Sequence, residues 1–309
     1  MRLRRGRPDL GRYADRFDIP AATGDLGVTF LGVSTLLVDD GETALLTDGF
    51  FSRPSLVRTL LGRVAPHEGR ISMALGRLGL GPAGGRVAAV LPVHTHYDHA
   101  LDSAAVARRT GAVLVGGESV ANLGRGACFD EAQLVVVTPG ESRTFGAFTV
   151  THVESRHCPP DRFPGTIDQP VVPPARVSDY RCGEAWSILV EHTSGRAVLV
   201  QGSAGFLAGA LAGRDAQVVY LGVGQLGLMD EGYIRSYWAQ SVEAVGASRV
   251  VLTHWDDFFR GLEKPLRAVP YAGDDLDVTM RVLSGLASQQ GVALHLPTLW
   301  RREDPWSGW

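Results

Sequence analysis

The sequence predicts an α/β sandwich, with two sheets inside and helices outside, built as one domain from two similar halves. Short apolar runs alternate with turn signals from residue 27 onward, and segments of helical period separate the later runs. Two of these runs, at 86–93 and 248–253, lead directly into a histidine that an aspartate soon follows. We expect this domain at residues 27–309, after a solvated N-terminal leader at residues 1–26.

The first half is predicted to be a meander followed by alternating strands and helices. Residues 27–49 hold three apolar runs, punctuated at Asp39-Asp40-Gly41 and ended at Asp48-Gly49, which is typical of three strands. The elements expected after them are helices at 55–62 and 71–78, a buried strand at 86–93, a helix at 103–109 stopped by Gly111, and a strand at 112–117.

The second half repeats strands first and helices later. The expected elements are strands at 133–138, 143–155, 187–202 (a hairpin turning at 193–195), 217–223, 249–253 and 292–296, and helices at 231–247 and 275–290. Between them lies a proline-rich loop at 158–183. It is too long for a mere connector, so we expect a lid or a binding loop.

Charge and cysteine content limit the partners and the compartment. The 30 Lys and Arg against 33 Asp and Glu give a net charge of −3, which disfavours non-specific binding to nucleic acid or anionic membranes. No apolar run approaches the roughly 18 residues that span a bilayer. Three cysteines cannot all pair, which favours a reducing compartment, so we expect a cytoplasmic protein. The partner that we expect is a small-molecule substrate. The tail tryptophans, Trp300, Trp306 and Trp309, leave open a homo-oligomer contact, a covered apolar patch or a frayed terminus.

A cluster of metal-ligand side chains follows the strand at 86–93. His94 and His96 are two residues apart, so on extended chain their imidazoles point the same way and can converge on one cation. Asp98 and His99 follow where the chain turns. Four ligand-type side chains in six residues at the end of a buried strand indicate a metal site, most simply zinc.

A catalytic zinc ion needs three protein ligands, so further histidines must join from elsewhere. His157 comes just after the strand at 143–155, where the long loop begins, whereas His152 is expected to pack within that strand. His254 directly follows the strand at 249–253, and Asp256 is expected to orient its imidazole. The remaining histidines, His67, His192 and His295, are expected at the surface or in packing.

These residues resemble the metallo-β-lactamase fold superfamily. Its H-x-H-x-D-H signature stands at residues 94–99, and LGVSTLLVDDGETALLTDGFF, THVESRH and LTHWDDF resemble its opening strands and the strands of its later histidines. The ending H-W-D-x-F is most similar to the branch that contains L-ascorbate-6-phosphate lactonase-like and N-acylphosphatidylethanolamine phospholipase D-like proteins. The resemblance implies a four-layer αββα sandwich.

The resemblance also implies two metal sites and a structural aspartate, here Asp48. The first site would use His94, His96 and His157, and the second would use Asp98, His99 and His254. Where the superfamily has a carboxylate that bridges both metals, this chain has Ser203 after Gly202. A neutral hydroxyl is a poor ligand, so we expect one tightly held zinc and a second ion that is weak or absent, with manganese or iron as alternatives.

This site predicts a metal-dependent hydrolase of a small ester, lactone or phosphoester. Three neutral imidazoles on zinc lower the pKa of bound water to about 7 and supply hydroxide near neutral pH. Asp98 would orient or deprotonate that water, and His254 would stabilise the developing oxyanion. Tyr97 would either donate to the oxyanion or pack under the loop. The alternatives are a mononuclear iron oxygenase on the same fold and a non-catalytic metal-binding or ligand-binding protein.

Overall fold

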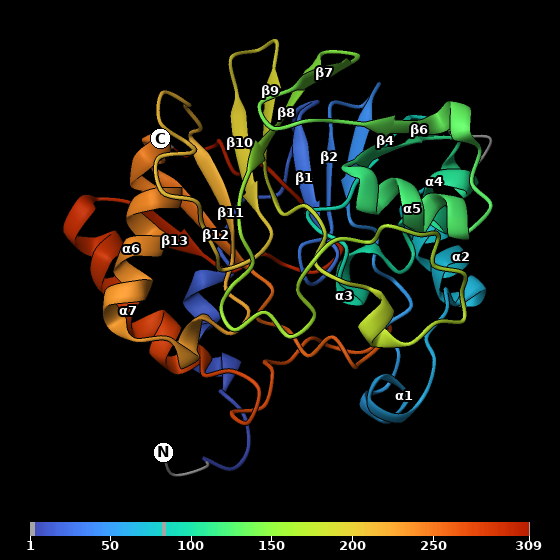
Figure 1. Cartoon of the computed structure of the whole chain (residues 1–309). Helices are drawn as coiled ribbons and strands as arrows, with labels where there is room; N and C mark the ends of the chain where they lie inside the picture. The colour runs from blue at the N-terminus through green and yellow to red at the C-terminus, as the bar shows by residue number, and fades with distance from the viewer. Residues whose placement is uncertain (1–3, 82–84, 309) are drawn as a thin grey trace.

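The computed structural model describes residues 4–81 and 85–308 and confirms the predicted architecture of two inner sheets with helices outside (Figure 1). The first sheet has the order β14-β1-β2-β3-β4-β5-β6. Its strands are β1 Gly27–Phe30, β2 Leu36–Asp39, β3 Ala44–Thr47, β4 Val87–Leu91, β5 Val113–Gly116, β6 Leu134–Val136 and β14 Arg302–Glu303.

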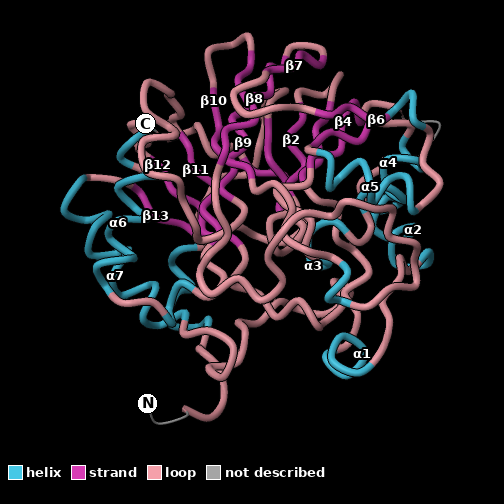
Figure 2. The backbone as a smooth tube through the Cα atoms, viewed as in Figure 1, coloured by secondary structure: helices cyan, strands magenta, loops and turns pink. Residues whose placement is uncertain are grey.

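The second sheet has the order β13-β12-β11-β10-β9-β8-β7. Its strands are β7 Ser142–Phe145, β8 Phe148–Glu154, β9 Trp186–His192, β10 Ala197–Gln201, β11 Val218–Gly222, β12 Arg249–Thr253 and β13 Ala293–His295. Figure 2 shows the strands of both sheets at the centre and most of the helices at the two sides.

Each sheet joins an antiparallel part to a parallel part. Strands β1, β2 and β3 pair antiparallel, and β3 to β6 pair parallel. In the second sheet β7 to β10 pair antiparallel and β10 to β13 parallel. The carboxyl ends of parallel neighbours meet at one edge of their sheet, so the residues after β3 and after β4 emerge together. That edge is where the first four predicted ligands lie.

Helices cover the outer faces. The α-helices are α1 Leu56–Leu61, α2 Glu68–Arg77, α3 Tyr97–Ala100, α4 Ser103–Thr110, α5 Glu118–Gly126, α6 Glu231–Ser241 and α7 Leu276–Gln290. Short 3-10 helices are η1 Leu10–Arg16, η3 Glu131–Gln133, η4 Val177–Asp179, η5 Leu226–Leu228 and η6 Glu243–Val245. Among the described residues, none of these helices is long and apolar enough to cross a membrane.

The main core lies between the two sheets. Val28, Phe30 and Leu91 of the first sheet and Ile188 and Leu199 of the second belong to one buried cluster. All five side chains are fully buried. Alternating residues of both sheets thus meet across a shared core, which fixes where the strand ends stand relative to each other.

The structure differs from the predicted elements in several places, three of which bear on the packing. Helix α5 was not predicted, because two glycines interrupt the helical pattern of its nine residues. Helix α6 ends at Ser241 rather than near residue 247, where η6 and the left-handed Gly246 follow instead. The short strand β14 pairs with β1 and places the tail against the first sheet, and Trp306 is buried. Trp309 lies outside the described residues.

Most of the described residues before β1 are exposed, but several of them make contacts with the domain that a solvated leader would not make. Arg7 donates from Nη1 to Asp257 Oδ2 at 3.2 Å and to the Ala268 carbonyl at 2.7 Å. Ile19 is buried in the main core, and Ala21 forms a β-bridge with Glu303. These contacts with residues distant in sequence could not be deduced from composition.

Asp102 ties α4 to the loop that follows β3. Its carboxylate is buried and accepts from the backbone N–H groups of Phe51 (2.8 Å) and Ser52 (2.6 Å) and from Ser52 Oγ (2.6 Å). Burial outweighs these bonds and raises the pKa of Asp102 to about 6.

We expect Asp102→Asn to change how stability depends on pH. The native carboxyl holds its proton more tightly than the unfolded one, so its contribution to stability falls as pH rises from about 4 to about 6. The free energy of unfolding of the wild type should therefore drop relative to Asp102→Asn by up to about 3 kcal/mol between pH 4 and pH 7. Urea unfolding of both proteins across this range measures it, and parallel pH profiles would contradict it.

Candidate metal centre

Six side chains of the predicted ligand set come together as two adjacent groups. His94, His96 and His157 form the first, and Asp98, His99 and His254 form the second. Within each group the potential ligand atoms lie within 4.8 Å of one another. The groups touch, because the rings of His94 and His99 are 3.9 Å apart between centroids.

Three loops supply the six residues. His94 to His99 follow β4 and enter α3, whose first turn carries Asp98 and His99. His157 follows β8, and His254 follows β12. Because β4 and β12 belong to different sheets, the two groups form where the strand ends of both sheets face each other.

The first group presents three ring nitrogens to a common point. The ring centroids of the three histidines are 4.6 to 5.0 Å apart. His157 Nδ1 lies 2.7 Å from the Cys158 carbonyl, which leaves Nε2 for a metal. His96 Nε2 lies 3.2 Å from Asp161 Oδ1, which leaves Nδ1. Both nitrogens of His94 are buried without a hydrogen-bond partner.

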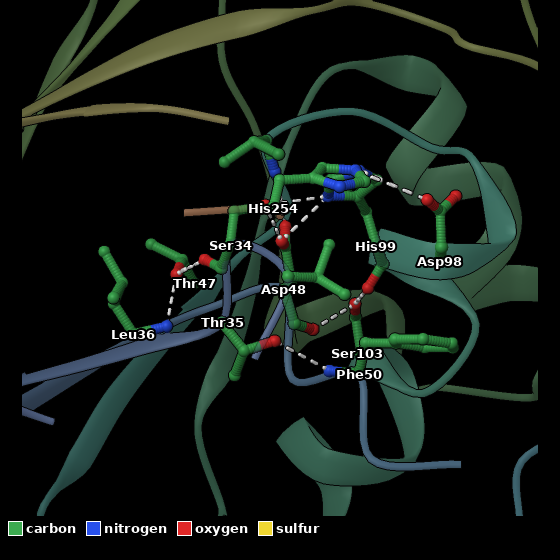
Figure 3. A network of polar contacts seen from close by, with 12 residues as sticks. Ser34, Thr35, Leu36, Thr47, Asp48, Phe50, Asp98, His99, Ser103 and His254 are labelled. Atoms are coloured by element: carbon green, nitrogen blue, oxygen red, sulfur yellow. Dashed lines mark hydrogen bonds and ion pairs between the residues drawn. The ribbon is translucent and has the colours of Figure 1, made fainter. Parts of the chain in front are cut away.

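The second group is held from behind by Asp48 (Figure 3). His99 Nδ1 lies 2.9 Å from Asp48 Oδ2, so its Nε2 faces the site, 3.2 Å from His254 Nε2 and 3.8 Å from Asp98 Oδ2. His254 Nε2 in turn lies 3.5 Å from the same Asp98 oxygen. Asp48 also accepts from Ser34 Oγ at 2.7 Å and from the Val93 N–H at 2.9 Å. It therefore supports His99 and the strand end before His94 together.

The backbone is strained around the second group. Asp48, His254 and Val33 adopt φ angles of +52°, +60° and +53°. A left-handed conformation costs free energy in any residue with a Cβ and most in a β-branched one. The His254 N–H donates to the Val33 carbonyl at 2.8 Å, which couples two of the strained residues.

The prediction that Asp256 orients the His254 imidazole is wrong. Asp256 accepts from the Val33 N–H at 2.8 Å and forms a fully buried ion pair with Arg53 at 2.7 Å. Its side chain therefore fixes the backbone turn beside His254 and makes no hydrogen bond with the ring.

Ser203 also has a different contact from the one a ligand would make. Its Oγ accepts from the Cys158 N–H at 3.0 Å, directly after His157. Two residues later, a Cβ on Gly205 would lie 2.1 Å from the Arg156 carbonyl, so only glycine allows this close approach. The turn at 202–205 thus supports the backbone that carries His157.

Burial sets the charge state of the ligands. Burial and the neighbouring imidazoles hold the pKa of His94 well below its ordinary value and lower the pKa of His157 to about 4. Both rings are then neutral at pH 7, which is the form that binds metal. Burial favours a higher pKa for Asp98, but His99 and His254 override it and hold that pKa below its usual range, so Asp98 is an anion.

Tyr97 packs as a ring under the site. It lies edge-on to Phe50 and Phe258, and burial raises the pKa of its hydroxyl. This agrees with the packing alternative, and its role as a donor stays a prediction.

The histidines expected outside the site have other contacts. His67 caps α2, His192 lies 3.4 Å from Asp40, and His295 lies 2.6 Å from Asp18. His152 is buried in β8, edge-on to the ring of Trp186. None of the four belongs to a metal-ligand group among the residues that the structure describes.

Sequence reasoning missed Asp161 and Cys182. Both lie in the long loop, and with His96 they form a third group whose ligand atoms lie within 4.8 Å. Thr95 anchors the loop, because its N–H donates to the Cys182 carbonyl at 2.8 Å and its hydroxyl to the Arg181 carbonyl at 2.5 Å. Asp161 comes three residues after the Cys158 that opens the loop, but sequence spacing alone does not indicate that it turns back onto His96.

The donor set fits a metal ion. Both buried ring nitrogens of His94 lack hydrogen bonds, and a cation bound at one of them would remove part of that cost. Three imidazoles suit zinc, and two imidazoles with one carboxylate suit zinc or iron. Asp48 and Asp161 are the outer carboxylates that usually orient metal-bound histidines.

Comparison with solved structures shows the metallo-β-lactamase fold. A possible metal-dependent hydrolase from Veillonella parvula aligns with a TM-score of 0.55 at 16% identity, over 89% of this chain and 98% of that one. Igni18, a metallo hydrolase from Ignicoccus hospitalis, aligns at 0.52 and 15%, over 89% and 96%. CmlA, a diiron β-hydroxylase from Streptomyces venezuelae, aligns at 0.51 and 14%, over 92% of this chain and 55% of CmlA. No family model and no curated protein matches the sequence.

We expect Asp161→Asn to weaken metal binding, because His96 then loses the charged partner that orients it. Outer-sphere carboxylates of this kind typically contribute 10- to 100-fold in affinity, so we expect about a tenfold loss. Competition with a chromophoric chelator measures it. Asp179→Asn is the matched control. Asp179 lies in the same loop but accepts from the Arg176 N–H rather than contacting a ligand, so this variant should bind metal as the wild type does. Equal metal affinity in both variants would show that Asp161 does not contribute to metal binding.

Proposed function

We propose that this chain is a metal-dependent hydrolase that cleaves a small ester, lactone or phosphoester. The observation that carries the proposal is the group of His94, His96 and His157, three imidazoles that converge at one point with the His94 nitrogens unpartnered. The fold shared with the metallo hydrolases described above supports it.

When bound, zinc would supply a Lewis acid that lowers the pKa of a coordinated water to about 7. The chain would contribute the rest. Asp98, an anion on the first turn of α3, would accept a proton from water that enters between the groups. His254, whose Nε2 faces Asp98, would hold negative charge that develops on the substrate. Asp48 would keep the His99 ring fixed.

We propose that the first site binds metal tightly and the second weakly. The six ligands carry one negative charge, that of Asp98, against the four positive charges of two dications. Ser203 adds no charge and its hydroxyl already accepts a hydrogen bond from the Cys158 N–H. Without a bridging carboxylate, only the solvent and the charge of Asp98 offset the repulsion between two cations.

The substrate class rests on the ending His254-Trp255-Asp256-Asp257-Phe258, which resembles the lactonase-like and phospholipase D-like branch. The three cysteines are free thiols, which fits the reducing cytoplasm that we propose as the compartment.

One observation favours a second candidate, an iron oxygenase. Asp98, His99 and His254 form a group of two histidines and one carboxylate, the donor set that non-haem iron enzymes use. We rank it second because the first group lacks a carboxylate. Iron rather than zinc in the purified protein would reverse this order.

We expect the two groups to lose metal independently. His94→Ala and His157→Ala should each abolish tight binding, whereas His254→Ala should retain close to one ion per chain and weaken only the second. Elemental analysis of each protein, before and after loading with zinc or manganese, measures this. His152→Ala, a buried histidine outside the groups, is the control and should match the wild type. Full metal content in His94→Ala would contradict the assignment.

We expect the zinc-loaded protein to hydrolyse a nitrophenyl ester or a nitrophenyl phosphodiester, and dialysis against a chelator to remove that activity. Returning zinc should restore it, and Asp98→Asn should lower kcat by about 100-fold or more while the first metal stays bound. Turnover that survives metal removal would contradict the proposal. A metal-loaded protein without turnover on esters, lactones and phosphoesters would point to the non-catalytic alternative.

A further inference from the structure

Helix α1 exposes its apolar side chains to solvent. Leu56, Val57, Leu60 and Leu61 are 48%, 68%, 70% and 86% exposed, and no residue of the helix is buried. Figures 1 and 2 show α1 projecting from the body, apart from the other labelled helices. Single exposed leucines are ordinary, but four on one short helix form a patch that usually has a partner.

The structure holds this helix in place without burying it. Ser55 caps its start, and Val64, just after it, exchanges two backbone hydrogen bonds with Ala175 of the long loop at 2.8 and 3.0 Å. An isolated six-residue helix is unstable in water, so these anchors are what keep it formed. Val172, in the same loop, adds another apolar side chain that is 67% exposed.

Cationic side chains surround the base of this helix. Arg58 donates from Nε to the Arg63 carbonyl, and Arg63 donates to the Pro174 carbonyl. Arg176 follows the Val64–Ala175 bridge. None of the three guanidinium groups has an ion-pair partner within the described part of the chain, although other surface arginines, such as Arg125, do. We call these three arginines with Leu56, Val57, Leu60 and Leu61 the α1 tip.

We propose that the α1 tip docks the protein on an anionic lipid surface. Aliphatic side chains that enter the acyl region, with arginines at the level of the phosphates, are the pattern that interfacial attachment requires. Peripheral attachment of this kind needs no spanning helix. The net charge of −3 opposes general adsorption, so the attraction comes from the tip alone.

A second copy of the chain is the less suitable occupant. In a symmetric dimer the same patch meets itself, so the unpaired arginines of one tip would approach those of the other. A stable dimer also buries roughly 800 Å² on each partner, and a helix of six residues, about 9 Å long, offers little of that area. An anionic surface instead complements the charge and accommodates a projecting helix.

This inference is independent of the proposed hydrolase activity, because the α1 tip shares no residue with the metal groups. Its failure would leave the metal site untouched, and a protein without metal should still dock. The experiment below therefore reports on the surface alone.

Co-flotation with vesicles tests the proposal. The wild type should float with vesicles of phosphatidylcholine mixed with phosphatidylglycerol, and much less with phosphatidylcholine alone. Leu60→Glu/Leu61→Glu should lose flotation by tenfold or more, since the charges oppose insertion. Arg58→Gln/Arg63→Gln, which retains Arg176, should weaken it by about fivefold for each arginine and reduce the dependence on phosphatidylglycerol.

Leu228→Glu is the matched control, an exposed leucine on η5 that should float as the wild type. Unchanged metal content and melting temperature show that the variants fold. Flotation that is absent in the wild type, or equal in all variants, would overturn the proposal. So would a dimer in light scattering that Leu60→Glu/Leu61→Glu dissociates, since it would assign the tip to a second copy.

Discussion

The burial of several histidines with unpartnered ring nitrogens is the constraint on which the rest of the structure depends. An unpaired buried polar group costs about 1–3 kcal/mol, and His94 alone has two such atoms. Burial and proximity keep His94 and His157 neutral, so each ring has a lone pair that can bind a cation. A cation that accepts one lone pair from each ring reduces the penalty, and the convergence of strand ends from different sheets is what places the rings around it.

Three aspartates hold this arrangement from outside, each in a different way. Asp48 fixes the His99 ring and the strand end before His94, Asp161 contacts His96 from the long loop, and Asp256 locks the turn that carries His254. Asp256 in turn is neutralised by the buried Arg53. The strained backbone conformation at Asp48 and His254 persists because these hydrogen bonds and ion pairs hold it in place.

The sequence was sufficient for the sandwich and for the six ligand candidates, because both depend on local signals. Apolar runs with turn residues mark the strands, and the spacing from His94 to His99 marks the first loop. The contacts of Ser203, Asp161 and the first residues of the chain depend on partners 45 to 282 positions away. Asp256 shows the limit clearly: its place beside His254 suggested a contact with the ring, whereas its actual partners are Val33 and Arg53.

A crystal structure of the protein loaded with zinc, with anomalous data collected on both sides of the zinc edge, tests the central claim most directly. The account predicts a strong anomalous peak among His94, His96 and His157, and a weaker peak or none among Asp98, His99 and His254. A zinc ion among His96, Asp161 and Cys182, or no zinc at these histidines, would contradict it.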